Sequence, residues 1–187
     1  MSILSYLALA ALVYVVAFAV FRIVALNYRR YGKLKPLATT LQVAIFALHG
    51  ALFHLGLMTT RWPRFPDSKF QVVIGALVEV GGLALLFAGI GVFGSLARMI
   101  GRRVDDLKQS GVYRYSRNPQ LVGYGFFILA FVIIWPSWLT VIATVIYVGI
   151  AHTMSHVEEQ HLRRAYGADY EAYCQRTPRH LGIPRFE

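Results

Sequence analysis

The feature that most constrains this sequence is a series of apolar segments about twenty residues long, separated by short stretches that hold most of the charged residues. Of the 187 residues, 57% are hydrophobic and 15% are charged; soluble domains have roughly half and a quarter. One small core cannot bury this much apolar surface, so most of it is expected to face lipid. These proportions exclude an ordinary soluble globule and a disordered chain.

The apolar segments predict an all-α, polytopic membrane protein with five transmembrane helices. A helix that rises ~1.5 Å per residue needs about 20 residues to cross the ~30 Å hydrocarbon core. The last two spans form a hairpin, because Pro136 disrupts helical hydrogen bonding between them. We expect one membrane domain over residues 1–187. The predicted spans are residues 3–26, 37–58, 70–97, 120–135 and 137–155.

The charge is strongly positive, with 19 Lys and Arg against 9 Asp and Glu. Outside the spans, fifteen basic residues lie in residues 27–35, in residues 98–117 and after His161, whereas three lie between the second and third spans. Cytoplasmic loops are enriched in Lys and Arg, so this asymmetry predicts an N-terminus outside and a C-terminus in the cytoplasm. The membrane would be the plasma membrane in a bacterium or the endoplasmic reticulum in a eukaryote. Nucleic acid is not expected as a partner.

The first segment that could carry chemistry is residues 111–125, which the topology places on the cytoplasmic side. Asn118 followed by Pro119 is a strong helix start, because Asn can cap free N–H groups and Pro fits the first helical turn. The partial positive charge of this helix end suits a carboxylate or a phosphate. The alternative is a capped helix with interfacial aromatics and arginines that reach into the interface.

The second segment begins at His152 and contains two adjacent acids, Glu158 and Glu159. Neighbouring helical residues point about 100° apart, so one acid can face a pocket while the other faces solvent. The alternative is that both are solvated surface residues. Gly167 is expected to end this helix, and Asp169 to begin a short interfacial helix. That helix is expected to place three side chains against the membrane surface, those of Tyr170, Tyr173 and Cys174.

Together, these segments resemble the isoprenylcysteine carboxyl methyltransferase and phospholipid methyltransferase family of integral membrane enzymes. The first motif is Gly-x-Tyr-x-x-x-Arg-Asn-Pro-x-x-x-Gly at residues 111–123, which is followed by the apolar hairpin. The second is Glu-Glu-x-x-Leu-x-x-x-Tyr-Gly-x-x-Tyr-x-x-Tyr-x-x-x-x-Pro at residues 158–178. The resemblance covers residues 81–178, which would be the catalytic half.

The resemblance implies S-adenosylmethionine held on the cytoplasmic side, with a lipid-like or isoprenylated acceptor that enters from the bilayer. A glycine motif of the phospholipid enzymes has its counterpart in Gly89-Ile90-Gly91. The two acids would meet the charged groups of the cofactor. The residues carried over to the cofactor site by position are Asp105, Asp106, Leu107, Lys108, Tyr113, Asn118, Pro119, Gln120, Leu121, Glu158 and Glu159.

The acceptor is open between a carboxylate and an amine. Asn118 stands where the carboxyl enzymes usually have His, and Met154 stands where the eukaryotic ones have an Arg that would bind the substrate carboxylate. An amine acceptor needs a base to remove its proton, and the candidates are His156 and Glu159. His152 is a further candidate on the substrate side.

Glu79 lies within the third span, where an acid is costly unless it is paired or faces water. It is expected either to take a substrate-side role or to form a buried pair with Arg22 or His54. No metal site is expected, since His49 and His54 are five residues apart, about 140° around a helix, and do not share a face.

Two other functions compete with methyl transfer. One is an NADPH-dependent membrane reductase related to sterol reductases, which have a similar C-terminal half but are longer. The other is a non-enzymatic membrane subunit that keeps the scaffold for a partner or for transport. The acidic pair and the Asn-Pro helix start are both present and favour the methyltransferase.

Overall fold

The computed structural model describes residues 1–59, 68–94 and 106–185, and within these ranges the chain is helical without β-strands. Its helices are α1 (Ile3–Tyr31), α2 (Pro36–Thr59), α3 (Lys69–Gly91), the short 3-10 helix η1 (Gly111–Arg114), α5 (Pro119–Ile134), α6 (Trp138–Tyr166) and α7 (Ala168–Arg176). The expected all-α fold is confirmed. Residues 95–97 of the predicted third span and Asp105 of the predicted cofactor site lie outside the described ranges.

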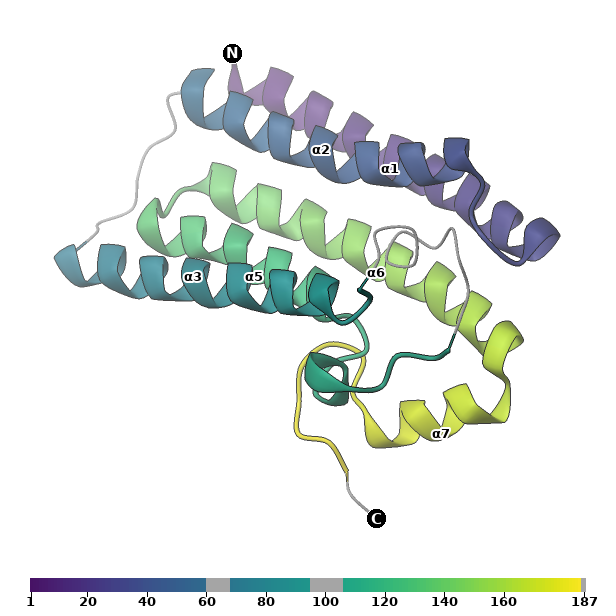
Figure 1. The fold of residues 1–187 in the computed structure, drawn as a ribbon. Helices are drawn as coiled ribbons and strands as arrows, with labels where there is room; N and C mark the ends of the chain where they lie inside the picture. The colour runs from purple at the N-terminus through teal and green to yellow at the C-terminus, as the bar shows by residue number, and fades with distance from the viewer. Residues whose placement is uncertain (60–67, 95–105, 186–187) are drawn as a thin grey trace.

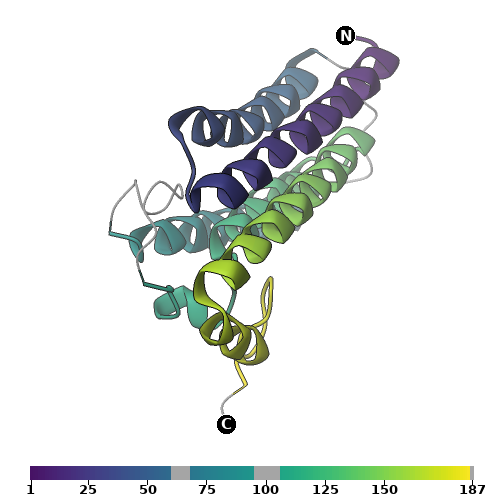
Figure 2. The ribbon, with the colours of Figure 1, turned by 90° about the vertical axis from the view of Figure 1, so that its right-hand side faces the viewer.

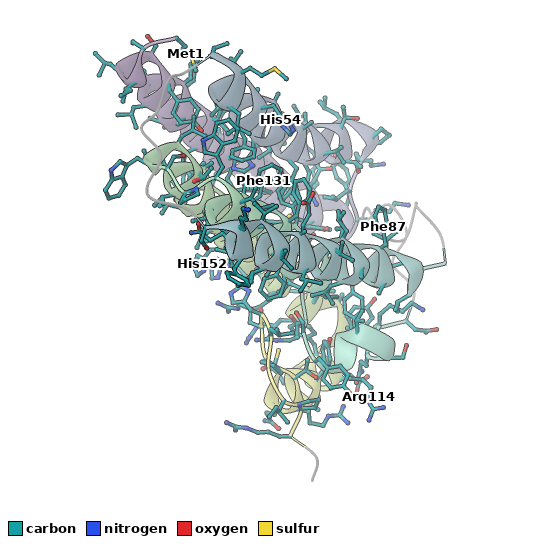
Figure 3. The ribbon with its side chains drawn as sticks, turned by 90° about the vertical axis from the view of Figure 1, so that its left-hand side faces the viewer. Met1, His54, Phe87, Arg114, Phe131 and His152 are labelled. Atoms are coloured by element: carbon teal, nitrogen blue, oxygen red, sulfur yellow. The ribbon has the colours of Figure 1, made fainter. Side chains whose placement is uncertain are left out.

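The long helices form an antiparallel bundle in which α6 is central (Figure 1). Helix α6 packs against α1, α2 and α5, and α3 packs on the other side of α5. The α1–α2 turn, the start of α5 and the end of α6 therefore lie at one end of the bundle. Met1 and Arg114 lie at opposite ends of the molecule (Figure 3).

Four helices, α1, α2, α3 and α6, are long and apolar enough to cross a membrane. Helix α5 is apolar but has only 16 residues, about 24 Å at ~1.5 Å per residue. The fifth span and the orientation in the membrane stay predictions. Helix α1 continues to Tyr31, beyond the predicted span, because its helical geometry ends only at Gly32, where φ is +64°.

The hairpin between α5 and α6 is where the sequence places it, at residues 135–137. Ser137 caps α6: its Oγ accepts from the Thr140 N–H at 3.4 Å, while the Ser137 N–H donates to Thr140 Oγ1 at 3.3 Å. From this turn α6 runs without interruption to Tyr166, and Gly167 ends it as predicted. One helix thus joins the predicted fifth span to the acidic pair.

The third helix is shorter than the predicted span. Helix α3 ends at Gly91. The N–H groups of Phe93 and Gly94 then bond carbonyls only three residues back, and Gly94 takes φ +59°. A left-handed residue here stops the helix where the apolar pattern alone predicts continuation.

Glycines set the close approach of α3 to α5. A Cβ on Gly82 would lie 2.7 Å from the Gly123 carbonyl oxygen, and one on Gly123 would lie 2.5 Å from the backbone nitrogen of Leu86. These neighbours are backbone atoms, which a rotamer change cannot move away. Small residues allow such packing between membrane helices.

Gly123→Ala is therefore expected to lower the free energy of unfolding by about 3 kcal/mol, the upper end of what overpacking costs. Thermal unfolding of the purified protein in detergent measures this. The matched control is Gly81→Ala, because a Cβ on Gly81 has no neighbour within 4 Å. Equal melting temperatures for the two variants would show that α3 and α5 are not packed through glycine.

Candidate active site

Both motifs meet at the end of the bundle where α5 begins and α6 ends. There η1, α7 and the C-terminal segment lie side by side below the long helices (Figure 2). The segment that contains η1 comes from the first motif, and α7 belongs to the second. Residues that are far apart in the sequence are thus brought to one place.

Tyr113 connects these parts. Its hydroxyl donates to Gln120 Oε1 at 2.8 Å, and its carbonyl accepts from the Tyr173 hydroxyl at 2.7 Å. Burial raises the pKa of the Tyr113 phenol well above its ordinary value, and the negative charge of Glu158 raises it further. Tyr113 is therefore a neutral hydrogen-bond donor in this site.

Glu159 is buried, with 3% of its surface exposed, and lies between two arginines. Arg179 binds it with two hydrogen bonds, from Nε to Oε1 at 2.8 Å and from Nη2 to Oε2 at 2.6 Å. Arg117 Nη1 lies 3.1 Å from Oε1. A paired, bidentate geometry of this kind is what a buried carboxylate needs to remain charged. We call Glu159, Arg117 and Arg179 the ion-pair cluster.

The ion-pair cluster ties the C-terminal segment to the start of α5. Asn118 Nδ2 donates to the Arg179 carbonyl at 2.9 Å, and the Arg117 N–H donates to the Pro178 carbonyl at 3.0 Å. The position of Asn118 before Pro119 at the helix start is as predicted, but the prediction that its side chain caps the helix is wrong. The Asn118 side chain donates to the C-terminal segment instead.

The prediction that α7 lays its tyrosines on the membrane surface is also wrong. Tyr170 and Tyr173 are 0% and 3% exposed. The half-buried Cys174 Sγ accepts from Arg117 Nη1 at 2.6 Å. The amphipathic face of α7 therefore packs against the segment before α5, since that segment offers polar partners that lipid does not.

Glu158 points to another part of the molecule. Its Oε1 accepts from Gln42 Nε2 on α2 at 3.4 Å, and the side chain is half-buried. Within the described ranges, Glu158 forms no ion pair. The two adjacent acids thus point in different directions, as neighbouring helical residues do. Glu159 is bound by arginines, and Glu158 is bound by the Gln42 amide on α2.

The remaining predicted site residues lie around this end of the bundle. Asp106 is exposed in the segment before η1. The Leu121 carbonyl accepts a hydrogen bond from the Tyr147 hydroxyl within the bundle. Leu107, Lys108 and Gln120 are half-buried, and Pro119 is buried.

Three candidates form no hydrogen bond or ion pair with Glu158 in the described part of the chain. His152 and His156 are exposed on α6, and His156 Nε2 accepts from the Gln160 amide at 2.8 Å. Glu79 is half-buried on α3, twelve residues before its end, or about 18 Å at ~1.5 Å per residue. It forms no ion pair with any residue that the structure describes, while its candidate partner His54 bonds the Gly50 carbonyl at 2.8 Å.

The two glycines near the end of α3 differ in their surroundings. A Cβ on Gly89 would lie 3.2 Å from Pro119 Cγ and 3.0 Å from Gln120 Cγ. Gly89 thus lets α3 approach the start of α5. Gly91 is exposed, and a Cβ on it has no neighbour within 4 Å among the described residues.

Sequence reasoning missed the side chains that hold the two acids. Arg117 is part of the first motif, but that motif does not indicate which carboxylate it pairs with. Arg179 follows the second motif, and its position after Pro178 carries no signal of its pairing. Gln42 could have been found, because it is the one amide side chain in the predicted span 37–58.

Comparison with known proteins identifies the region that carries the site. Residues 70–169 match the family model described as phospholipid methyltransferase, which covers more than half of the chain. No curated protein and no solved structure matches. The match begins with α3 and ends in α7, so it leaves out the α1–α2 hairpin and the C-terminal segment.

Proposed function

The chain belongs to the phospholipid methyltransferase family, and we propose that it uses S-adenosylmethionine to methylate the polar end of a lipid-like acceptor. Membership and the four long apolar helices make it an integral membrane protein and a methyltransferase. We further propose that α5 is a fifth span and that the active site faces the cytoplasm, as the distribution of Lys and Arg favours.

The observation that carries the cofactor proposal is the charge arrangement around the acidic pair. The ion-pair cluster holds two arginines and one carboxylate, which leaves one positive charge in excess. Arg117 Nε is buried and has no hydrogen-bond partner among the described residues. This excess positive charge, together with the N–H groups of the first turn of α5, suits the carboxylate of the cofactor. Glu158 suits its ammonium and sulfonium groups.

S-adenosylmethionine would supply a methyl group on a positively charged sulfur; the acceptor attacks the methyl carbon, and the sulfur leaves in line as a neutral thioether. The protein need mainly align the two reactants and exclude water. Tyr113 and Gln120 are hydrogen-bonded to each other and would line the cofactor site.

We assign different roles to the two acids. Both oxygens of Glu159 are bound by arginines, so we propose that it positions Arg117 and Arg179 rather than taking a proton. Glu158 is the carboxylate that would touch the cofactor. If the acceptor is an amine, His156 is the base candidate that remains.

Thermal unfolding in detergent tests the cofactor. S-adenosylhomocysteine at 100 times its Kd is expected to stabilise the protein by about 2.7 kcal/mol, because it binds only the folded state. NADPH at the same concentration is expected to leave the melting temperature unchanged. Stabilisation by NADPH alone would favour a reductase, and no stabilisation of folded protein by S-adenosylhomocysteine would exclude the proposed function.

A further inference from the structure

The α1–α2 hairpin lies outside the part of the chain that matches the family, yet α2 contributes polar side chains beside Glu158. Thr39 and Gln42 are three residues apart and lie on the same face of α2. They are 7% and 8% exposed, and Gln42 donates to Glu158. Two polar side chains are therefore buried on one face of this largely apolar helix.

Both side chains have an oxygen atom without a partner in the described part of the chain. Gln42 Oε1 and Thr39 Oγ1 are buried and form no hydrogen bond there. Since the amide nitrogen of Gln42 is bound to Glu158, its oxygen can be satisfied only by a further donor. A buried polar atom left unsatisfied is destabilising, so native structures keep few of them without a function.

The α1–α2 hairpin is fixed to α6 close to Glu158. The ring of Tyr28 on α1 stacks on that of His161 on α6, with centroids 4.0 Å apart and planes 9° apart. His161 is three residues after Glu158, so the contact fixes α1 to α6 within one turn of the acid. The oxygens of α2 are thus part of a built arrangement and not of a loose surface.

The chemistry of these groups selects a particular ligand group. A carboxylate, an amide oxygen and a hydroxyl are hydrogen-bond acceptors, and Glu158 has no cation as partner in the described part of the chain. A group that carries positive charge and several N–H donors would satisfy all three. A primary ammonium has this chemistry, and both the cofactor and an amine acceptor can supply one.

We propose that Thr39 and Gln42 bind, together with Glu158, the ammonium group of a ligand in the active site. This inference rests on the proposed function and adds to it two specificity residues from outside the family segment. The α1–α2 hairpin is then part of the active site and not only of its membrane anchor.

Direct binding to the purified full-length protein tests this. The variants are Thr39→Val and Gln42→Leu, and the matched control is Thr40→Val, which changes the exposed neighbouring threonine. The probes are S-adenosylhomocysteine, dihexanoyl phosphatidylethanolamine and dihexanoyl phosphatidylcholine. The last has the same charge as the second but no N–H donors. Calorimetry gives the Kd, and thermal unfolding without ligand gives the stability of each variant.

For at least one of the first two probes, Kd is expected to rise about tenfold in both variants, since one lost hydrogen bond to a charged group contributes about 1.5 kcal/mol. Without ligand, the melting temperature of Thr39→Val is expected to be unchanged or higher, because an unsatisfied buried atom is removed. That of Gln42→Leu is expected to fall slightly, because the hydrogen bond to Glu158 is lost as well. Phosphatidylcholine binding and the control should not change. A rise for S-adenosylhomocysteine assigns the ammonium to the cofactor, and a rise for phosphatidylethanolamine assigns it to the acceptor.

Unchanged Kd values for both ammonium probes would overturn the inference, as would a loss of stability without ligand in the conservative Thr39→Val variant. The failure of the proposed function has a different signature. In that case the wild-type protein itself does not bind S-adenosylhomocysteine, and the phosphatidylethanolamine arm still decides whether α2 binds an ammonium.

Discussion

Glu159→Gln is expected to lower the free energy of unfolding by about 3–5 kcal/mol, because it leaves two arginines without the carboxylate that compensates their charge. For a protein of this size, this corresponds to a fall in melting temperature of roughly 10 °C. The loss should also loosen the C-terminal segment, since the Arg179 carbonyl binds Asn118. Thermal unfolding and protease resistance of that segment measure the two effects.

The matched control for this variant is Glu171→Gln. Glu171 also pairs with an arginine, with Arg163 Nη1 at 2.9 Å, but the two side chains are 50% and 46% exposed. Such a surface pair contributes about 0–1 kcal/mol. Adding Arg179→Met to Glu159→Gln should recover part of the loss, because one uncompensated charge is removed. If Glu159→Gln is as mild as Glu171→Gln, Glu159 is not the centre of a buried ion-pair cluster.

Glu158→Gln is expected to have the opposite profile, with weakened binding and preserved stability. Removing its charge should raise the Kd for S-adenosylhomocysteine about 10- to 100-fold, since a hydrogen bond to a charged group contributes about 1.5–3 kcal/mol. The melting temperature without ligand should be unchanged or higher, because Glu158 is a half-buried carboxylate with no ion pair in the described ranges. Calorimetry on the purified protein measures the Kd.

This second prediction separates the two acids. Glu171→Gln again serves as the control for the loss of one negative charge from this end of the bundle. A Glu158→Gln variant that binds S-adenosylhomocysteine as the wild type does would return Glu158 to a solvated surface role. A Glu158→Gln variant with a lower melting temperature but an unchanged Kd would show that Glu158, like Glu159, stabilises the fold and does not bind the cofactor.

Much of the fold follows from local signals. Pro136 and Ser137 specify the hairpin, and Gly167 ends α6, because these residues act on the backbone where they stand. The ends of α1 and α3 could not be predicted from apolar patterns, since they are set by Gly32 and Gly94, which adopt positive φ. Hydrophobicity locates the lipid-facing part of a helix and says little about where its hydrogen bonding stops.

The site was less predictable than the fold. From the sequence, the side chains of Glu158 and Glu159 are expected to point in different directions. Their partners come from α2, from the start of α5 and from the C-terminal segment. Pairing across such distances in the chain leaves no periodic pattern. The same holds for Tyr173, whose hydroxyl reaches the Tyr113 carbonyl inside the protein and not the membrane surface.

The most direct test of methyl transfer is the fate of a labelled methyl group. Membranes that contain the protein are incubated with S-adenosylmethionine labelled in its methyl group, and the lipids are extracted. We predict label in the lipid fraction with the wild-type protein and little with Glu158→Gln. Label stable to base would indicate an N-methyl product, and base-labile label a methyl ester. Folded wild-type protein that puts no label into lipid would contradict this assignment.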